Sequence, residues 1–200
     1  MAQDLRVWGM ALTMMCGCGE GLVPRSGAAE GVWTASSAGG SEPTLLDHSR
    51  WSPLCPDQDP LAEHRPRQDD CPAASWREEQ GALEVETGHC QYFSAAQPLP
   101  TPLYEGEALR VVLWHGDLVS ADEGQGHVAL LLDEQVLWET TVPIPSKAQV
   151  YDVELVVARA WPVDTTLTFH LHNHGFNAWK LLSLSRTRGT PAPQTNGESG

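Results

Sequence analysis

The sequence lacks any apolar run of the roughly 20 residues that a membrane-spanning helix needs. Basic residues are also scarce, since 12 Lys and Arg stand against 26 Asp and Glu and give a formal net charge of −14. Proteins that bind nucleic acids obtain most of their affinity from basic side chains. The composition therefore argues against a nucleic acid as the partner.

Motifs of well-known enzyme chemistry are missing as well. The chain has no Gly-x-Ser-x-Gly elbow, no Gly-rich phosphate loop, no His-Glu-x-x-His helix and no Cys-x-x-Cys pair. Its 18 Gly and 15 Pro interrupt helices and argue against a helical bundle. We therefore predict a protein that is not an enzyme, has little helix and carries no cofactor.

The first 18 residues carry features of an export signal. Val7 to Met15 form an apolar stretch of signal-peptide length, and Cys18 follows the small residue Gly17. This arrangement resembles the signal of a bacterial lipoprotein, which implies lipidation of Cys18. The protein is then expected at the outer membrane or cell surface, with the lipid as its membrane contact. Secretion into the periplasm is the alternative.

The rest of the chain divides into segments that differ in composition and in hydrophobic pattern. Residues 19–70 are rich in Gly, Ser, Pro and Asp without a sustained period, which is typical of a tether. In residues 71–188, short apolar stretches alternate with turn signals, which predicts an all-β domain of about eight strands. A two-sheet jelly-roll β-sandwich fits this count. Residues 189–200 have the composition of a disordered tail.

Two short motifs within the predicted sandwich carry a resemblance. Tyr104-Glu105-Gly106-Glu107 precedes a long strand, and Gly175 to Leu181 ends in Asn-Ala-Trp-Lys-Leu. Both resemble jelly-roll sandwiches of the carbohydrate-binding-module and galactose-binding-like class. The resemblance implies binding of a ligand or an envelope partner, with a glycan as the candidate. The alternatives are a purely structural envelope protein and a metal-dependent enzyme that uses a histidine cluster.

Three cysteines remain once the export signal is removed, namely Cys55, Cys71 and Cys90. Cys71 and Cys90 both lie at the boundary of the predicted domain, and we predict that they form a disulfide. Cys55 is expected to be free or to pair between molecules, and a Cys55–Cys71 bridge is the alternative.

The one cluster of side chains that could take part in chemistry is in the segment Phe169 to Gly175, where every second residue is a histidine. Strand periodicity places His170 and His172 on one face, while His174 lies at the following turn. The apolar residues of the alternation are expected to face the core: Leu167, Phe169 and Leu171. Histidines two apart on a strand can share a metal ion, so His170, His172 and His174 are the candidate metal ligands.

Other residues are expected to complete this metal site or to bind a different ligand. His115 or His127 can supply a further ligand across the sheet, whereas solvent-facing or loop-anchoring histidines are the competing interpretation. We expect at most two of the three clustered histidines to converge, and no tightly bound metal. Asn173 and Asn177 flank Gly175 and predict a hairpin turn. Six residues are candidate ligand contacts: His115, Trp161, His170, His172, Asn173 and Asn177.

Overall fold

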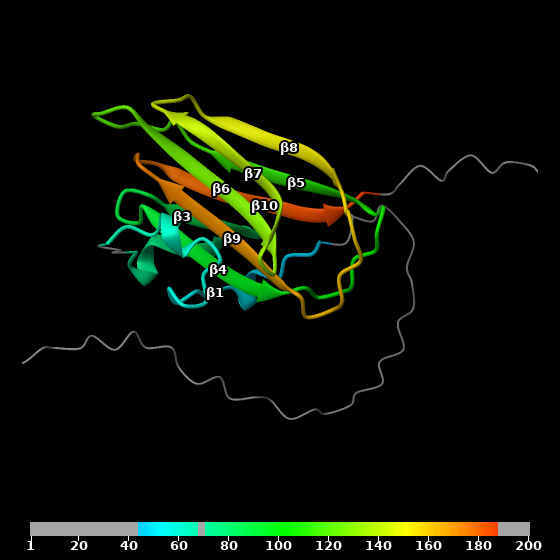
Figure 1. The fold of residues 1–200 in the computed structure, drawn as a ribbon. Helices are drawn as coiled ribbons and strands as arrows, with labels where there is room; N and C mark the ends of the chain where they lie inside the picture. The colour runs from blue at the N-terminus through cyan, green and yellow to red at the C-terminus, as the bar shows by residue number, and fades with distance from the viewer. Residues whose placement is uncertain (1–43, 68–70, 188–200) are drawn as a thin grey trace, which may run out of the picture. The chain divides into compact units, whose positions relative to one another are not determined.

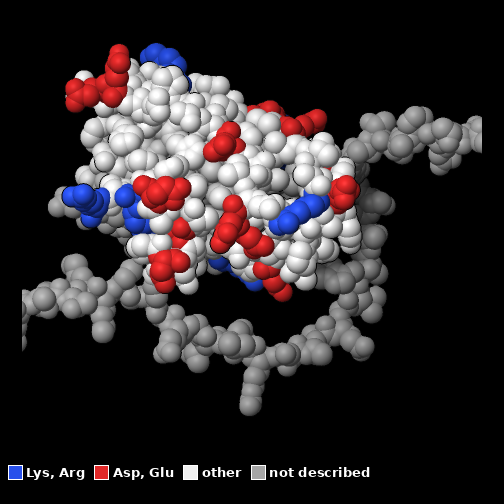
Figure 2. All heavy atoms as spheres, viewed as in Figure 1, with Lys and Arg blue, Asp and Glu red and all other residues white. Residues whose placement is uncertain are grey.

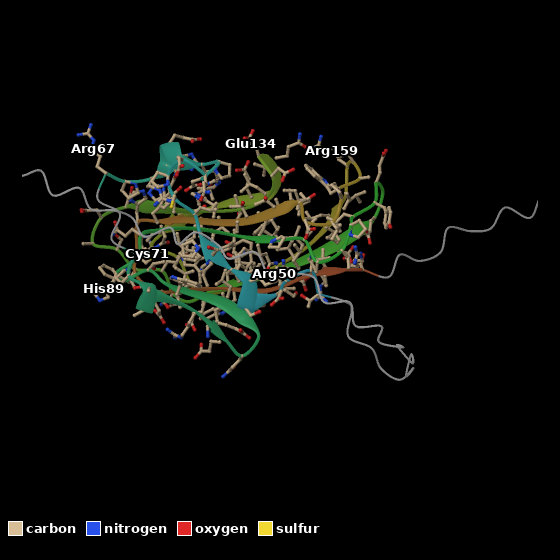
Figure 3. The ribbon with its side chains drawn as sticks, turned by 90° about the horizontal axis from the view of Figure 1, so that it is seen from below. Arg50, Arg67, Cys71, His89, Glu134 and Arg159 are labelled. Carbon is tan, nitrogen blue, oxygen red and sulfur yellow. A yellow bond between two sulfur atoms is a disulfide. The ribbon has the colours of Figure 1, made fainter. Side chains whose placement is uncertain are left out.

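A computed structural model of the chain describes residues 44–67 and 71–187, which form two five-stranded β-sheets packed face to face (Figures 1 and 3). Sheet 1 contains, in spatial order, β1 (Ser52–Pro53), β4 (Tyr92–Pro98), β9 (Thr166–Asn173), β6 (Gly124–Leu132) and β7 (Gln135–Ile144). Sheet 2 contains β2 (Trp76–Glu79), β3 (Ala82–Glu86), β10 (Ala178–Arg186), β5 (Ala108–His115) and β8 (Gln149–Val156). All neighbouring strands are antiparallel. The predicted all-β sandwich is therefore confirmed.

Alternation of side chains decides which face of each strand enters the core. Strand β9 buries Leu167, Phe169 and Leu171 between the sheets, each at 0% exposure. On β5 the same period buries Leu109, Val111 and Leu113. The predicted core face of β9 is confirmed, and His170 and His172 consequently point to the opposite, outer face of sheet 1.

The described residues hold ten strands rather than about eight. The two additional strands, β1 and β2, have two and four residues and show no clear alternation. Within this described part of the chain, helical structure is limited to three single-turn 3₁₀ segments, η1 (His48–Arg50), η2 (Ala62–His64) and η3 (Ala73–Ser75). Among residues 44–67 and 71–187, no helix has the length and apolar character needed to cross a membrane.

Residues 44–67, which the sequence assigns to a tether, pack against the sandwich. Leu45, Leu46 and Trp51 are at most 6% exposed and belong to the core. The side chain of Gln97 on β4 accepts a hydrogen bond from Asp47 N and donates one to Leu45 O, at 3.0 Å each. The Gly, Ser and Pro content of the long segment concealed these apolar anchors. We call residues 54–67 the arm.

Several predictions fall outside the described residues. These are the export signal, lipidation of Cys18, the tether before residue 44 and the C-terminal tail.

On the face shown in Figure 2, acidic side chains are widely spread and basic side chains form no continuous patch. This face therefore offers no extended basic surface for a phosphate backbone.

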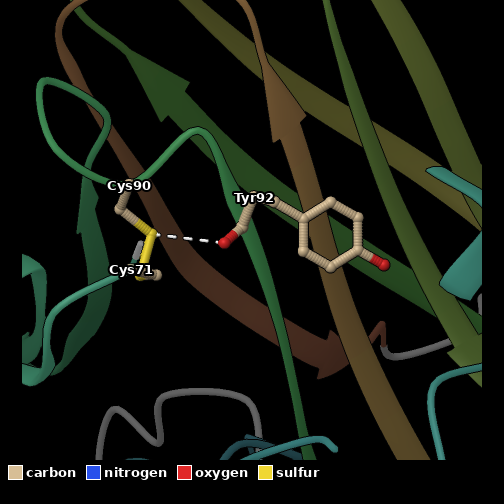
Figure 4. Close-up of a disulfide and its surroundings, with 3 residues drawn as sticks. All are labelled: Cys71, Cys90 and Tyr92. Carbon is tan, nitrogen blue, oxygen red and sulfur yellow. Dashed lines mark hydrogen bonds between the residues drawn. A yellow bond between two sulfur atoms is a disulfide. The ribbon is translucent and has the colours of Figure 1, made fainter. Parts of the chain in front are cut away.

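A disulfide joins Cys71, before β2, to Cys90, two residues before β4 (Figure 4). The predicted pairing is confirmed. Cys90 Sγ lies 3.4 Å from the carbonyl oxygen of Tyr92, whose ring points away from the bridge (Figure 4). Cys55 is also disulfide-bonded, so the expected free thiol is wrong.

Replacing Cys71 and Cys90 together by Ser should lower the free energy of unfolding by about 3 kcal/mol. The bridge closes a loop with a sequence separation of 19, and its loss increases the entropy of the unfolded chain. Urea unfolding of the variant and the wild type, both with the Cys55 bridge intact, measures the difference. A loss below about 1 kcal/mol would contradict this account.

Candidate metal centre

The antiparallel register aligns polar side chains in two rows on the outer face of sheet 1. Residues directly opposite each other in neighbouring strands point to the same side of a sheet. One row, across β4, β9, β6 and β7, consists of Ser94, His170, Ala129 and Glu139. The adjacent row consists of Tyr92, His172, His127 and Thr141. Three histidines from two strands thus lie close together on one surface.

The arm covers this surface and is held there by the carboxylate of Asp59. The Tyr92 hydroxyl donates to Asp59 Oδ2 at 2.5 Å, and the Ser94 hydroxyl donates to Oδ1 at 3.1 Å. Arg65 and Leu61 N donate to the same carboxylate at 3.0 Å each. Burial alone raises the pKa of Asp59, but these hydrogen bonds together lower the pKa below its ordinary value. The carboxylate is therefore charged and tightly bound at neutral pH.

Docking of the arm brings His64, the last residue of η2, over the two strands. Its ring centroid lies 5.3 Å from that of His127 and 5.5 Å from that of His170. The His127 and His170 rings are themselves 5.3 Å apart. One nitrogen from each of the three imidazoles falls within 4.8 Å of the other two. No other group of three potential metal ligands occurs among residues 44–67 and 71–187.

His170 is the most unusual member of the cluster. Its side chain is 0% exposed, and within the described part of the chain neither ring nitrogen has a hydrogen-bond partner. Burial, followed by the charges of His127 and its other neighbours, lowers the pKa of His170 to about 3. The imidazole is therefore neutral at physiological pH, which is the form that binds a metal ion. Buried polar groups without a partner are rare, so the two ring nitrogens of His170 are candidate ligand atoms.

His127 has the hydrogen bonding expected of a metal ligand. Its Nε2 lies 3.0 Å from Glu139 Oε2, while its buried Nδ1 has no partner in the described part of the chain. Such a carboxylate contact fixes the tautomer of a ligating histidine and orients its ring. His64 and His127 border a cavity of about 420 Å³, together with Glu139. The remaining residues around the cavity are Gln125, Thr141, His172 and His174.

The structure brings together only part of the cluster read from the sequence. Of His170, His172 and His174, only His170 belongs to the group of mutually close ligand nitrogens. The rings of His172 and His174 lie 4.5 Å apart beside this group and border the cavity. Burial, followed by His174, lowers the pKa of His172 to about 4.

His127, but not His115, supplies the further histidine across the sheet. His115 lies on β5 in sheet 2 and is fully buried, with its ring 4.6 Å from that of Trp179. Its Nδ1 contacts Gly116 O at 2.7 Å. This is the loop-anchoring role that the sequence offered as the competing interpretation for its histidines.

Asn173 and Asn177 have structural roles, but the hairpin expected between them is wrong. They connect β9 of sheet 1 to β10 of sheet 2, so the chain crosses from one sheet to the other. The amide of Asn173 donates to Gly175 O and accepts from Trp179 Nε1. The amide of Asn177 donates to Asp117 O at 2.6 Å.

Trp161 does not form an exposed platform. Its side chain is 7% exposed, and the Arg159 guanidinium covers its ring at 3.9 Å from the centroid. As a candidate ligand contact, Trp161 therefore offers little exposed ring surface. Backbone hydrogen bonds with Leu103 in both directions hold the residue against the sandwich.

His64 is the site residue that the sequence interpretation missed. It lies in a segment without periodicity, where strand or helix patterns give no information about its neighbours. The signal that was present is local: a tryptophan that is buried, Trp51, and a cysteine that is disulfide-bonded, Cys55, precede it. Composition averaged over residues 19–70 concealed that signal.

None of the protein-family models compared with the sequence matches it, and no curated protein does. Similar solved structures include a family 28 carbohydrate-binding module specific for non-crystalline cellulose, at 12% identity and TM-score 0.41 over 58% of this chain and 86% of that chain. A family 4 carbohydrate-binding module has 12% identity and TM-score 0.37 over 56% of this chain and 75% of its own. The N-terminal cellulose-binding domain of β-1,4-glucanase C from Cellulomonas fimi has 10% identity and TM-score 0.36 over 56% and 82%.

Replacing Asp59 by Ala should release the arm while the sandwich stays folded. Hydrogen bonds to a charged group contribute about 1.5–3 kcal/mol each, so losing three side-chain partners should increase opening more than tenfold. Hydrogen exchange of the amides of residues 54–67, followed by mass spectrometry, measures this opening. The matched control is Asp57→Ala, because Asp57 is an exposed carboxylate of the same arm. Equal exchange rates in the two variants would contradict the anchoring role of Asp59.

Proposed function

We propose that this protein binds a divalent transition-metal ion, with zinc as the reference ion, through His64, His127 and His170. The observation that carries the proposal is the convergence of three imidazole nitrogens within 4.8 Å around a buried His170. Imidazole nitrogens bind zinc at about 2.0–2.1 Å, which places tetrahedral ligands about 3.3 Å apart. His64 and His127 are only half-buried, so their rings have room to adjust toward this spacing.

The surroundings of the three histidines support the same proposal. Glu139 orients His127 from behind, as the outer carboxylate does in many zinc sites. Asp59 adds a second fixed negative charge beneath the cluster, and its charge raises the pKa of His170 against the larger effect of burial. A carboxylate on the outer nitrogen of one histidine and a second carboxylate close to another favour a cation between the three rings.

This proposal differs from the expectation of no bound metal, because the ligand set differs. The sequence placed His172 and His174 beside His170, and a three-histidine site of that kind would need the following turn to fold back. Here His64 and His127 replace them. The alternative drawn from the sequence was a metal-dependent enzyme that uses His170, His172 and His174. What the geometry supports best is metal binding through a different set of three histidines.

We also propose that the protein functions outside the cytoplasm. Two observations support export: the Cys71–Cys90 bridge and the disulfide-bonded state of Cys55. Structural disulfides form and persist in oxidising compartments. Lipid anchoring through Cys18 and a glycan ligand remain predictions from the sequence, and a glycan array with the exported chain tests the second.

Replacing His64 or His127 by Ala should weaken zinc binding at least about 100-fold, because each variant removes one of three ligands. Isothermal titration calorimetry with zinc measures the dissociation constant of each variant. His89→Ala is the control, because His89 is exposed and belongs to no ligand group (Figure 3). Both ligand residues are partly exposed, so the variants should fold. An unchanged dissociation constant in either one would refute the proposed centre.

Replacing Glu139 by Gln should weaken zinc binding by roughly 10–100-fold, the usual effect of losing an outer carboxylate. The variant keeps the shape of the side chain but removes the charge that orients His127. Glu134→Gln is the control, because Glu134 is an exposed acid of the β6–β7 turn (Figure 3). Equal zinc affinity in the two variants would show that Glu139 has no part in the centre.

A further inference from the structure

The three histidines approach the centre from different directions. His170 lies at the closed side, fully buried, with the Tyr92 ring 5.1 Å from its own. His64 reaches the centre from the arm and His127 from β6, and these two border the cavity of about 420 Å³ whereas His170 does not. A metal ion between them would therefore lie with His170 behind it and the cavity in front of it.

No carboxylate in the described part of the chain completes the ligand set. Glu139 contacts the outer nitrogen of His127 rather than the centre. Asp59 is engaged by Tyr92, Ser94, Arg65 and Leu61 N. The group of mutually close ligand atoms contains the three histidines and no acid.

His172 is the nearest remaining side chain that can bind a metal. Its ring centroid lies 6.3 Å from that of His64, and it is absent from the group of mutually close nitrogens. Its closest ring contact is with His174, at 4.5 Å, on the cavity side. His172 therefore lies beside the open side of the centre rather than in it.

We infer that a metal ion held by His64, His127 and His170 keeps one coordination position open to this cavity, and that this position takes water or a small anion. The inference rests on the proposed function. Three protein ligands with an exchangeable fourth position distinguish reactive zinc sites from closed structural ones. Three neutral imidazoles leave the charge of a divalent ion uncompensated in the first coordination shell, which favours an anionic fourth ligand.

The cavity has groups that suit the outer atoms of such a ligand. The Thr141 hydroxyl and the Gln125 amide provide hydrogen-bond donors around its wall. Glu139 is the one acid among the lining residues, and it is oriented toward His127. The ligand class is therefore a small anion with an oxygen or nitrogen donor, such as hydroxide or a short carboxylate.

Cobalt substitution of the full chain tests this inference, because the visible absorption of Co²⁺ reports its coordination. We expect Co²⁺ to give intense bands of low coordination number, and added azide to shift these bands with saturation. His172→Ala should keep azide affinity within about threefold of the wild type, and His89→Ala should behave as the wild type does.

Two other results separate failure of this inference from failure of the proposed function. If the wild type gives intense Co²⁺ bands that do not respond to azide, the inference of an open coordination position is wrong. If only His172→Ala responds to azide, His172 is the ligand that closes this position. Absence of the bands in wild-type protein that is folded by circular dichroism would overturn the proposed metal centre, and the inference with it.

Discussion

The buried carboxylate of Asp59 is the interaction on which the candidate centre depends. Tyr92 and Ser94 reach it from β4, and Arg65 and Leu61 N reach it from the arm itself. Arg65 also lies over the Tyr92 ring, 4.6 Å from its centroid. These contacts fix a segment that has almost no regular structure. They place His64 opposite His127 and His170, which are positioned by strands of sheet 1. Without the carboxylate, the outer face of sheet 1 would be an open surface with a pair of strand histidines.

Burial of His170 is unfavourable in the chain alone, because an imidazole with two unpaired nitrogens loses its hydrogen bonds to water. Ala129 stands opposite His170 in the row, and both residues are fully buried. A hydrophobic residue at position 170 would avoid the cost of a buried polar group. A histidine at position 170 is explained if another group binds the ring nitrogens that have no hydrogen-bond partner.

The sequence predicts those parts of the structure that follow from local periodicity. Alternation over Leu167 to Leu171 identified the core face of β9, and hence the outer face that carries His170. His127 was one of two histidines expected to contribute across the sheet, but pattern alone could not separate it from His115, which belongs to the other sheet. His64 was beyond reach, because its position depends on contacts between residues far apart in the chain. The crossing from Asn173 to Asn177 was missed for the same reason, since a turn sequence does not specify which sheet the next strand joins.

The spacing of the histidines on β9 has a consequence for how the chain would meet its metal. His170, His172 and His174 alternate within five residues, so even an unfolded chain offers a local chelating segment. The proposed ligands come instead from three remote segments, and only the completed sandwich brings them together. A metal captured early would have to exchange His172 and His174 for His127 and His64 as folding proceeds. Because the unfolded state competes for the same ion, metal binding would stabilise the fold by less than its native affinity alone suggests.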